Sequence, residues 1–303
     1  MAWQHIDYPG TNINFVLAES DQEIVALLGF IPFSRFDPSL DIDTVALAIW
    51  KRSDSAAPGT GLKMLNWLIT KKHLASVIAI GLNEATLPIY QSLGFKTGRM
   101  SHFAIFRPGL NESSITGQNI QHSATLGDGL RLLSHENELS EHAVFSIGEL
   151  LSSNQPLKSG TYYLERFQEH PWFDYQFLTL GRGTRVVLLV VIRVVTVGNS
   201  SVIRVVDIAG NLEELPLAAG ALSEVVSRLG ADYMDILVHG ADETAMHASG
   251  FQSTQSRPDL VIPNYFEPFE PRNVEVLFAY KTPNSPLHFH LHPADSDQDR
   301  PNE

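Results

Sequence analysis

The stretch NEATLPIYQSLGF, residues 83–95, decides the fold prediction for the first half of the chain. It follows an apolar run over 77–82 that reads as a strand. Pro88 is tolerated only in a first helical turn, so a short helix should begin near Thr86 and stop at the glycine of Gly-Phe. The same ending recurs as HGADETAMHASGF at 239–251, and the 156-residue spacing of the two copies indicates a duplicated domain.

The order of apolar and amphipathic segments predicts an α/β (α+β) protein of two repeats, each a mixed central sheet flanked by helices. We expect a first repeat over 1–110, a polar linker over 111–126, a second repeat over 127–292 and a charged tail over 293–303. The first repeat is truncated at its N-terminus, because only the second carries two helices between its first two strands.

Strands are expected where β-branched and aromatic residues gather, and helices where apolar residues recur every three or four positions. The expected strands cover 14–18, 23–33, 44–50, 77–82, 100–106, 129–134, 175–180, 184–197, 201–208, 233–238 and 272–281. The expected helices cover 62–73, 138–151, 161–169 and 216–229, with a short helix before each Gly-Phe ending.

The composition limits the classes of function. A formal net charge of −13 disfavours nucleic acid and anionic membranes as partners, since both attract basic surfaces. The longest apolar run, 186–192, is far too short to cross a bilayer, so we expect no membrane insertion. Without cysteine there is no disulfide or thiolate nucleophile, and the N-terminus lacks a signal-peptide pattern, which favours a cytoplasmic protein.

A glycine-containing loop, APGTGLKML at 57–65, precedes the first long helix. Glycines let the backbone close on a phosphate, and the N–H groups that open a helix can hold it without net positive charge. Together with the strand order, the Asn83-to-Tyr90 spacing and the Gly-Phe ending, this loop resembles the GNAT (GCN5-related N-acetyltransferase) family. Ala56 departs from the pattern, because the family usually has Gln or Arg there.

The resemblance implies a coenzyme A thioester as co-substrate and no metal. Its pyrophosphate would lie on the loop and the start of the helix, and Asn83 would contact the pantetheine or pyrophosphate region. A backbone N–H of the central strand, at Ile49 or Trp50, would bind the thioester oxygen as charge develops there. The residues of the loop that would bind the coenzyme are Gly59, Thr60, Gly61 and Leu62.

The second repeat departs further from the family. Its loop reads DIAGNLEEL at 207–215, poor in glycine and rich in acid, and Met246 stands where the first repeat has Tyr90. We therefore expect coenzyme A on the first repeat and the acceptor toward the helices of the second.

Two segments, YYLERFQEHPWFDY (162–175) and FHLHPADSDQDRPN (289–302), resemble those of bacterial tandem GNAT proteins from surface-polysaccharide gene clusters. The resemblance implies an acceptor that is a nucleotide-linked amino sugar, of the dTDP-3-amino-3,6-dideoxyhexose type. It also implies an acetyl or 3-hydroxybutanoyl donor and a role in lipopolysaccharide O-antigen synthesis.

Acyl transfer to an amine needs a proton donor for the thiolate and a base for the amine. Tyr90 is the candidate donor, since a phenol stays protonated at neutral pH. His170, at the end of an acceptor-lining helix, and Asp207, at the end of a central strand, are the candidate bases. Core packing for Tyr90, a helix-end role for His170 and a turn role for Asp207 remain open alternatives.

The acceptor could be held by the aromatic segment and by arginines. Arg35 and Arg166 could pair with a diphosphate, and aromatic rings could stack on a base or sugar. The candidate substrate-binding residues are Arg35, Tyr163, Glu165, Arg166 and Trp172. His288, His290 and His292 alternate, as metal ligands on one strand face would, but no carboxylate lies between them, so we expect no metal.

Two other readings stay open. A degenerate, non-catalytic GNAT pair that binds an acyl-coenzyme A would explain Ala56 and the truncated first repeat. An N-acetyltransferase for an amino acid or another small amine would use the same motifs. The sequence also leaves open a homodimer.

Overall fold

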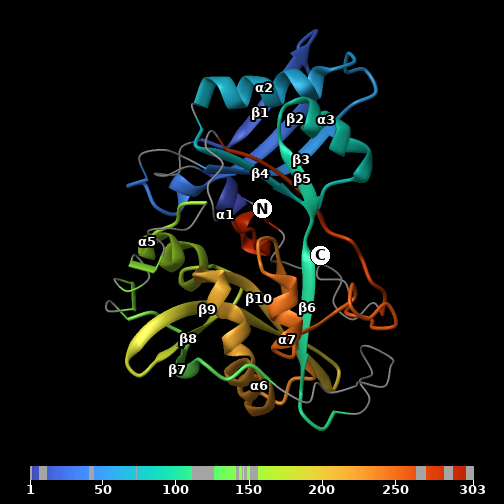
Figure 1. Ribbon diagram of the computed structural model, residues 1–303. Helices are drawn as coiled ribbons and strands as arrows, with labels where there is room; N and C mark the ends of the chain where they lie inside the picture. Colours follow the sequence, from blue (N-terminus) through green and yellow to red (C-terminus); the bar gives the residue numbers. More distant parts are fainter. Residues whose placement is uncertain are drawn as a thin grey trace. The chain divides into compact units, whose positions relative to one another are not determined.

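The computed structural model describes residues 2–6, 12–40, 44–72, 74–110, 126–140, 143–144, 146, 149–150, 156–263, 271–282 and 289–297 (Figure 1). The chain divides into two compact units. The first unit contains the chain up to Arg99, the C-terminal strand β13 and Asp295–Asp297. The second contains Met100–Glu275 and the segment that ends at Ala294. The predicted linker lies outside the described residues except for Leu126.

The first unit is built around a six-stranded sheet of order β1-β2-β3-β4-β13-β5. Its strands are β1 (Phe15–Ser20), β2 (Glu23–Pro32), β3 (Thr44–Arg52), β4 (Ser76–Ile80), β13 (Leu277–Lys281) and β5 (Lys96–Arg99). Only β3 and β4 pair in parallel. Its helices are α1 (Ala2–His5), η1 (Phe33–Arg35), α2 (Thr60–Lys72), η2 (Glu84–Thr86) and α3 (Leu87–Ser92).

The second unit is built around a seven-stranded sheet of order β12-β6-β11-β10-β9-β8-β7. Its strands are β7 (Arg131–Glu136), β8 (Gln176–Arg182), β9 (Arg185–Val197), β10 (Ser200–Gly210), β11 (Tyr233–Val238), β6 (Ser101–Phe106) and β12 (Gln252–Ser253). Its helices are α5 (Gly160–Tyr163), η3 (Leu164–Gln168), η4 (Leu212–Ala218), α6 (Ala219–Arg228) and α7 (Glu243–Ala248). A further short helix, η5 (Pro293–Asp295), has its first two residues assigned to the second unit and its last to the first.

One long helix covers a face of each sheet, and its apolar stripe explains why. In the first unit, Leu65 and Leu68 of α2 are fully buried against a cluster that includes Leu28 and Ala79. In the second unit, Leu222, Val225 and Val226 of α6 join a larger cluster formed by β8 to β11 and β6. Burial of each such side chain contributes about 1.5–3 kcal/mol.

The two halves of the chain exchange a strand. β6 follows directly on the first unit in sequence but lies in the second sheet, between β11 and β12. β13 comes from the C-terminal part but lies in the first sheet, between β4 and β5. The sequence boundaries assign 100–106 to the first repeat and 272–281 to the second, so strand pairing divides the chain differently. Periodicity cannot reveal such an exchange, because a strand's partner is chosen by long-range contacts.

With the exchange taken into account, the two sheets repeat one plan. In each, antiparallel strands lead to one parallel pair, and the exchanged strand and a short last strand follow. The second sheet has one more strand, β7, at the far edge. The prediction of a mixed α/β protein with two mixed sheets flanked by helices is confirmed.

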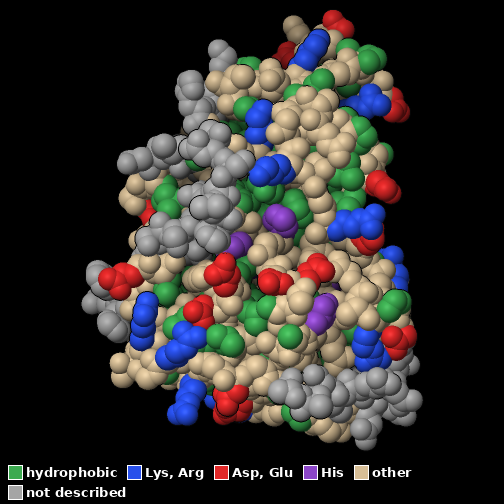
Figure 2. All heavy atoms as spheres, in the orientation of Figure 1, with side chains coloured by type: hydrophobic (Ala, Val, Ile, Leu, Met, Phe, Trp, Pro, Cys, Tyr) green, Lys and Arg blue, Asp and Glu red, His purple; other side chains and the backbone are tan. Residues whose placement is uncertain are grey.

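The surface charges and the helix lengths relate to the two partners that the composition disfavours, nucleic acid and membranes. Acidic and basic side chains are interspersed on the face seen in Figure 2. Within the described ranges, none of the helices combines the length and apolarity that a membrane crossing requires.

The strand exchange can be tested by hydrogen exchange on two core variants. Phe278 of β13 and Ile105 of β6 are both buried, so truncation to alanine should cost about 2–5 kcal/mol at either site. Phe278→Ala should raise exchange in β4 and β5, and Ile105→Ala should raise it in β11 and β12. The opposite assignment, with Phe278→Ala loosening β11, would show that the strands are not exchanged.

Candidate functional site

The two parallel strands of the first unit, β3 and β4, separate before β3 ends. β3 pairs with β4 only from Thr44 to Leu47, although it continues to Arg52 beside β2. The β2–β3 register shifts between Gly29 and Phe30, so β3 carries one extra residue there. Such a bulge bends a strand away from its neighbour and leaves backbone groups unpaired on the side that opens.

The second unit repeats this geometry. β10 pairs with β11 only from Val202 to Val205, yet it continues to Gly210 beside β9. The β9–β10 register shifts between Val205 and Asp207. Each unit therefore has an opening between its parallel strands, with a helix beginning just beyond it.

In the first unit, the loop that leads into α2 can receive an anion. Gly59 has φ of +80°, a conformation that favours glycine, and a Cβ there would meet nothing within 4 Å. Thr60 opens α2, and its backbone N–H is accepted by Ala57. Among the described residues, no acceptor bonds the backbone N–H of Gly61 or Leu62. These N–H groups open a 13-residue helix, so they can bind a phosphate.

Trp50 fills the space between this loop and Tyr90. A Cβ at Gly61 would lie only 2.6 Å from Nε1 of Trp50, so the indole is in close contact with the first turn of α2. The Trp50 ring also meets the Tyr90 ring edge-on, with centroids 6.0 Å apart. Ile49, its neighbour on β3, is half-buried. A thioester arm that ran from the loop to Tyr90 would therefore pass Trp50.

Tyr90 lies buried in α3, with its ring edge-on to Phe95 at 5.1 Å. Burial raises the pKa of the Tyr90 phenol, so it remains protonated and can only give a proton. Asn83 caps the short helix η2, where its Oδ1 accepts the N–H of Ala85 at 2.9 Å. The structure therefore gives Asn83 a capping contact, and among the described residues no acceptor bonds its amide nitrogen.

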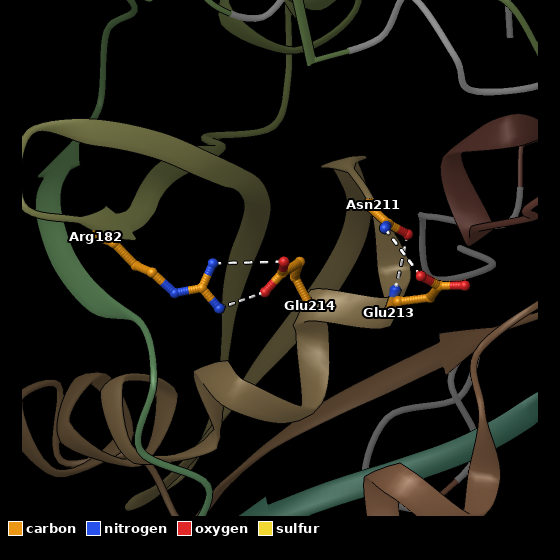
Figure 3. A network of polar contacts seen from close by, with 4 residues as sticks. All are labelled: Arg182, Asn211, Glu213 and Glu214. Atoms are coloured by element: carbon orange, nitrogen blue, oxygen red, sulfur yellow. Dashed lines mark hydrogen bonds and ion pairs between the residues drawn. The ribbon is translucent and has the colours of Figure 1, made fainter.

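The second unit's opening is chemically different, because side chains already occupy its helix N–H groups. Oδ1 of Asn211 accepts the N–H of Glu213 at 3.1 Å, while the amide of Asn211 donates to the Glu213 carboxylate at 3.2 Å (Figure 3). Arg182 holds Glu214 beside them at 2.7 Å. At α7, Oδ1 of Asp242 accepts two further backbone N–H groups.

A cavity of about 460 Å³ lies at this opening, lined by Glu213, Gly240, Ala241, Asp242, Ala245, Phe289 and His290. Its two carboxylates would repel a pyrophosphate, and the helix N–H groups that could offset the repulsion are already bonded. The first unit's loop is thus the better phosphate site of the two.

Asp207 lies at the bulge of β10 and is completely buried. Its Oδ2 accepts from Nζ of Lys158 at 2.6 Å, and its Oδ1 accepts from the Tyr163 hydroxyl at 3.0 Å. Both carboxylate oxygens are engaged, which suits a structural ion pair better than a general base. Sequence reasoning missed Lys158, because a single lysine in a Ser-Gly-rich turn carries no motif.

His170 closes the helix before Pro171. Its Nδ1 accepts the backbone N–H groups of Trp172 and Phe173 at 3.3 and 3.1 Å, and its ring stacks on Phe173. With Nδ1 as acceptor, the proton of the neutral ring is assigned to Nε2, which makes Nε2 a donor and not a base. The helix-end role is therefore the one that these contacts favour.

The predicted substrate-binding residues are not brought together in one unit. Arg35 belongs to the first, where its Nε donates to the Trp3 carbonyl at 3.3 Å and its guanidinium lies over aromatic rings. Arg166 is buried in the second unit against Phe167. Of the others, Tyr163 is buried, Glu165 is exposed and Trp172 is 59% exposed.

His292 lies in the second unit near the Lys158–Asp207 pair, and it is buried. Desolvation lowers the pKa of His292 to about 3; Asp207 opposes the shift, while Lys158, His290 and His239 add to it. The imidazole is therefore neutral in the folded protein. In the part of the chain that the structure describes, no three His, Asp or Glu side chains form a metal-binding group.

No protein-family model matches this chain, and no curated protein matches it. Among solved structures it resembles a GCN5-related N-acetyltransferase from Anabaena variabilis, with a TM-score of 0.48 and 12% identity over 90% of this chain and 63% of that one. It also resembles a GCN5-related N-acetyltransferase from Sphaerobacter thermophilus, with a TM-score of 0.44 and 12% identity over 93% and 85% of the two chains. This chain thus spans less than two thirds of the Anabaena protein. Both TM-scores lie below 0.5, so any activity has to rest on this chain's own residues.

The Lys158–Asp207 pair predicts a specific pattern of stability. Lys158→Met leaves a buried carboxylate without its ammonium and should lower the free energy of unfolding by about 3–5 kcal/mol. The double variant Lys158→Met with Asp207→Leu should lose less, because no charge is then left buried. Denaturant unfolding measures both, and a loss below about 1 kcal/mol in the single variant would contradict the buried pair.

The low pKa of His292 predicts a loss of stability in acid. The unfolded histidine takes up a proton near its usual pKa of about 6.5, whereas the folded one does so only near 3. The contribution of the neutral His292 to the free energy of unfolding is thus fully present above the unfolded pKa. It is lost as pH falls toward 3, by roughly 2 kcal/mol at pH 5. The stabilities of His292→Asn and of the unaltered protein are compared by thermal unfolding across this pH range. If the two proteins lose stability in parallel as the pH falls, His292 does not make this contribution.

Proposed function

We propose that the protein is an N-acyltransferase that moves an acetyl or 3-hydroxybutanoyl group from coenzyme A to the amine of a nucleotide-linked amino sugar. The observation that carries the proposal is the opening in the first unit. There, β3 parts from β4 after Leu47, and the N–H groups of Gly61 and Leu62 have no acceptor within the described chain. This combination offers an extended thioester a strand edge and offers its phosphates a helix N-terminus.

In the proposed complex, the pyrophosphate lies on Gly59, Thr60, Gly61 and Leu62. The pantetheine follows the freed edge of β3 past Ile49 and Trp50, where a backbone N–H stabilises the negative charge on the thioester oxygen. Asn83 lies three residues beyond the end of β4, within the same unit. No metal takes part.

The amine nitrogen attacks the thioester carbonyl carbon, the carbon–sulfur bond breaks, and the nitrogen loses a proton. Tyr90, which burial keeps protonated, gives its phenolic proton to the departing thiolate and regains a proton from water. Because Asp207 and Nδ1 of His170 are both occupied by hydrogen bonds of their own chain, we assign the amine's proton to water. The two residues then hold the acceptor-side elements in position.

The acceptor class rests on the resemblance of 162–175 and 289–302 to proteins of surface-polysaccharide clusters. We propose a dTDP-3-amino-3,6-dideoxyhexose, with the exposed ring of Trp172 available for stacking. An amino acid or another small amine is the alternative acceptor.

A second candidate function is a non-catalytic acyl-coenzyme A-binding pair. The position of Trp50 favours it, because the indole lies between the loop and Tyr90. Catalysis would require that ring to turn away when the thioester binds.

A thiol-release assay over a panel of acyl-coenzyme A donors and amine acceptors tests the proposal. Release with a dTDP-amino sugar supports it, and release only with amino acids or small amines replaces the acceptor. Calorimetric binding of acyl-coenzyme A without release in any mixture would favour the non-catalytic pair.

The location of the coenzyme site has its own test. Gly61→Val places a side chain against the Trp50 indole and the N–H groups of the loop, so it should raise the coenzyme A KM at least tenfold, about 1.4 kcal/mol. The matched variant in the second unit, Glu213→Gln, should leave this KM unchanged. A shifted KM in Glu213→Gln with none in Gly61→Val would move the coenzyme to the second unit.

A further inference from the structure

β1 is an edge strand with its outer side unpaired. It forms one end of the first sheet, and within the described residues β2 is its only strand partner. Asn14, just before it, accepts the N–H of Phe30, so the even-numbered residues direct their backbone groups toward β2. Backbone groups alternate in direction along an antiparallel strand, so those of Leu17 and Glu19 point away from the sheet.

Exposed apolar side chains gather at this edge. Leu17 is 53% exposed, and Ile13 and Ile24 beside it are 66% and 61% exposed. Natural edge strands are usually protected from pairing by charged side chains, especially lysine, by proline or by a bulge. β1 reads FVLAES: it has no lysine or proline, its one charged residue is Glu19, and the register shift against β2 places the extra residue on β2.

We propose that β1 pairs with β1 of a second copy of this chain, antiparallel and about a two-fold axis at Leu17. In that register the N–H of Leu17 donates to the carbonyl of Leu17 of the partner subunit. The N–H of Glu19 donates to the carbonyl of the partner subunit's Phe15. The reciprocal bond from the N–H of Phe15 to the carbonyl of the partner subunit's Glu19 is not formed, because that N–H already donates to the carbonyl of Ile13.

The register centred on Leu17 is the one that the side chains favour. It sets Leu17 against itself, which is an apolar contact. It sets Glu19 against Phe15, so no like charges lie opposite each other. A pairing centred on Glu19 would place two carboxylates face to face. One centred on Phe15 would need the outer side of Ile13, which already bridges to Ile6. A second copy of the chain therefore fits this strand in a defined way, and closed two-fold symmetry limits the assembly to a dimer.

Sedimentation velocity across a roughly hundredfold range of protein concentration tests the dimer. The unaltered chain should shift from monomer to dimer, and Leu17→Lys should raise the dissociation constant at least about tenfold by opposing two ammonium groups. Ile13→Lys is the matched control, because it adds the same charge to an equally exposed residue that lies opposite Asp21 of the partner subunit. A monomer at every concentration would overturn the proposal.

Cross-linking tests the register without relying on stability. The chain has no cysteine, so Leu17→Cys introduces a single thiol. Its two copies would have Cα atoms about 5.5 Å apart, within the span of a disulfide, whereas those of Ile13→Cys would lie about 27 Å apart. Mild oxidation should yield covalent dimers only from Leu17→Cys. A dimer that persists in Leu17→Lys and fails to cross-link through residue 17 would reject β1 as its interface.

Discussion

One extra residue in a strand governs both units of this protein. The bulges opposite Gly29 in the first sheet and near Val206 in the second bend β3 and β10 away from their parallel neighbours after four paired residues. A parallel pair that stayed hydrogen-bonded to its end would leave no edge for a ligand. The loop into α2, the Tyr90 ring and the acid-lined cavity near Asp242 matter because they border these two openings.

The two openings share a backbone plan and differ in what fills the helix N-termini. Within the described chain no acceptor bonds the N–H groups of Gly61 and Leu62, whereas Asn211 and Asp242 supply side-chain acceptors to the helix N–H groups of the second unit. In the second unit, the Lys158–Asp207 ion pair lies at the bulge of β10. The two units thus share one backbone architecture, and the proposed phosphate site is in the first.

Local sequence predicted what depends on local physics. The stripe at Leu65 and Leu68 marked α2, and Pro88 and Gly94 bounded the short helix that carries Tyr90. The partner of Asp207 lies 49 residues away in a turn without a motif, and the contact between Trp50 and Gly61 depends on where β3 bends. Neither could be predicted, because no periodicity encodes which distant residues meet. The exchange of β6 and β13 could not be predicted from the sequence for the same reason.

That exchange has a consequence for the order in which the chain can fold. During synthesis, β4 and β5 leave the ribosome nearly two hundred residues before β13, the strand that must lie between them. The second sheet has all its strands, β6 included, once Ser253 has emerged. The unit that comes first in the sequence therefore completes its sheet last, at the expense of the loop-closure entropy of a long-range pairing.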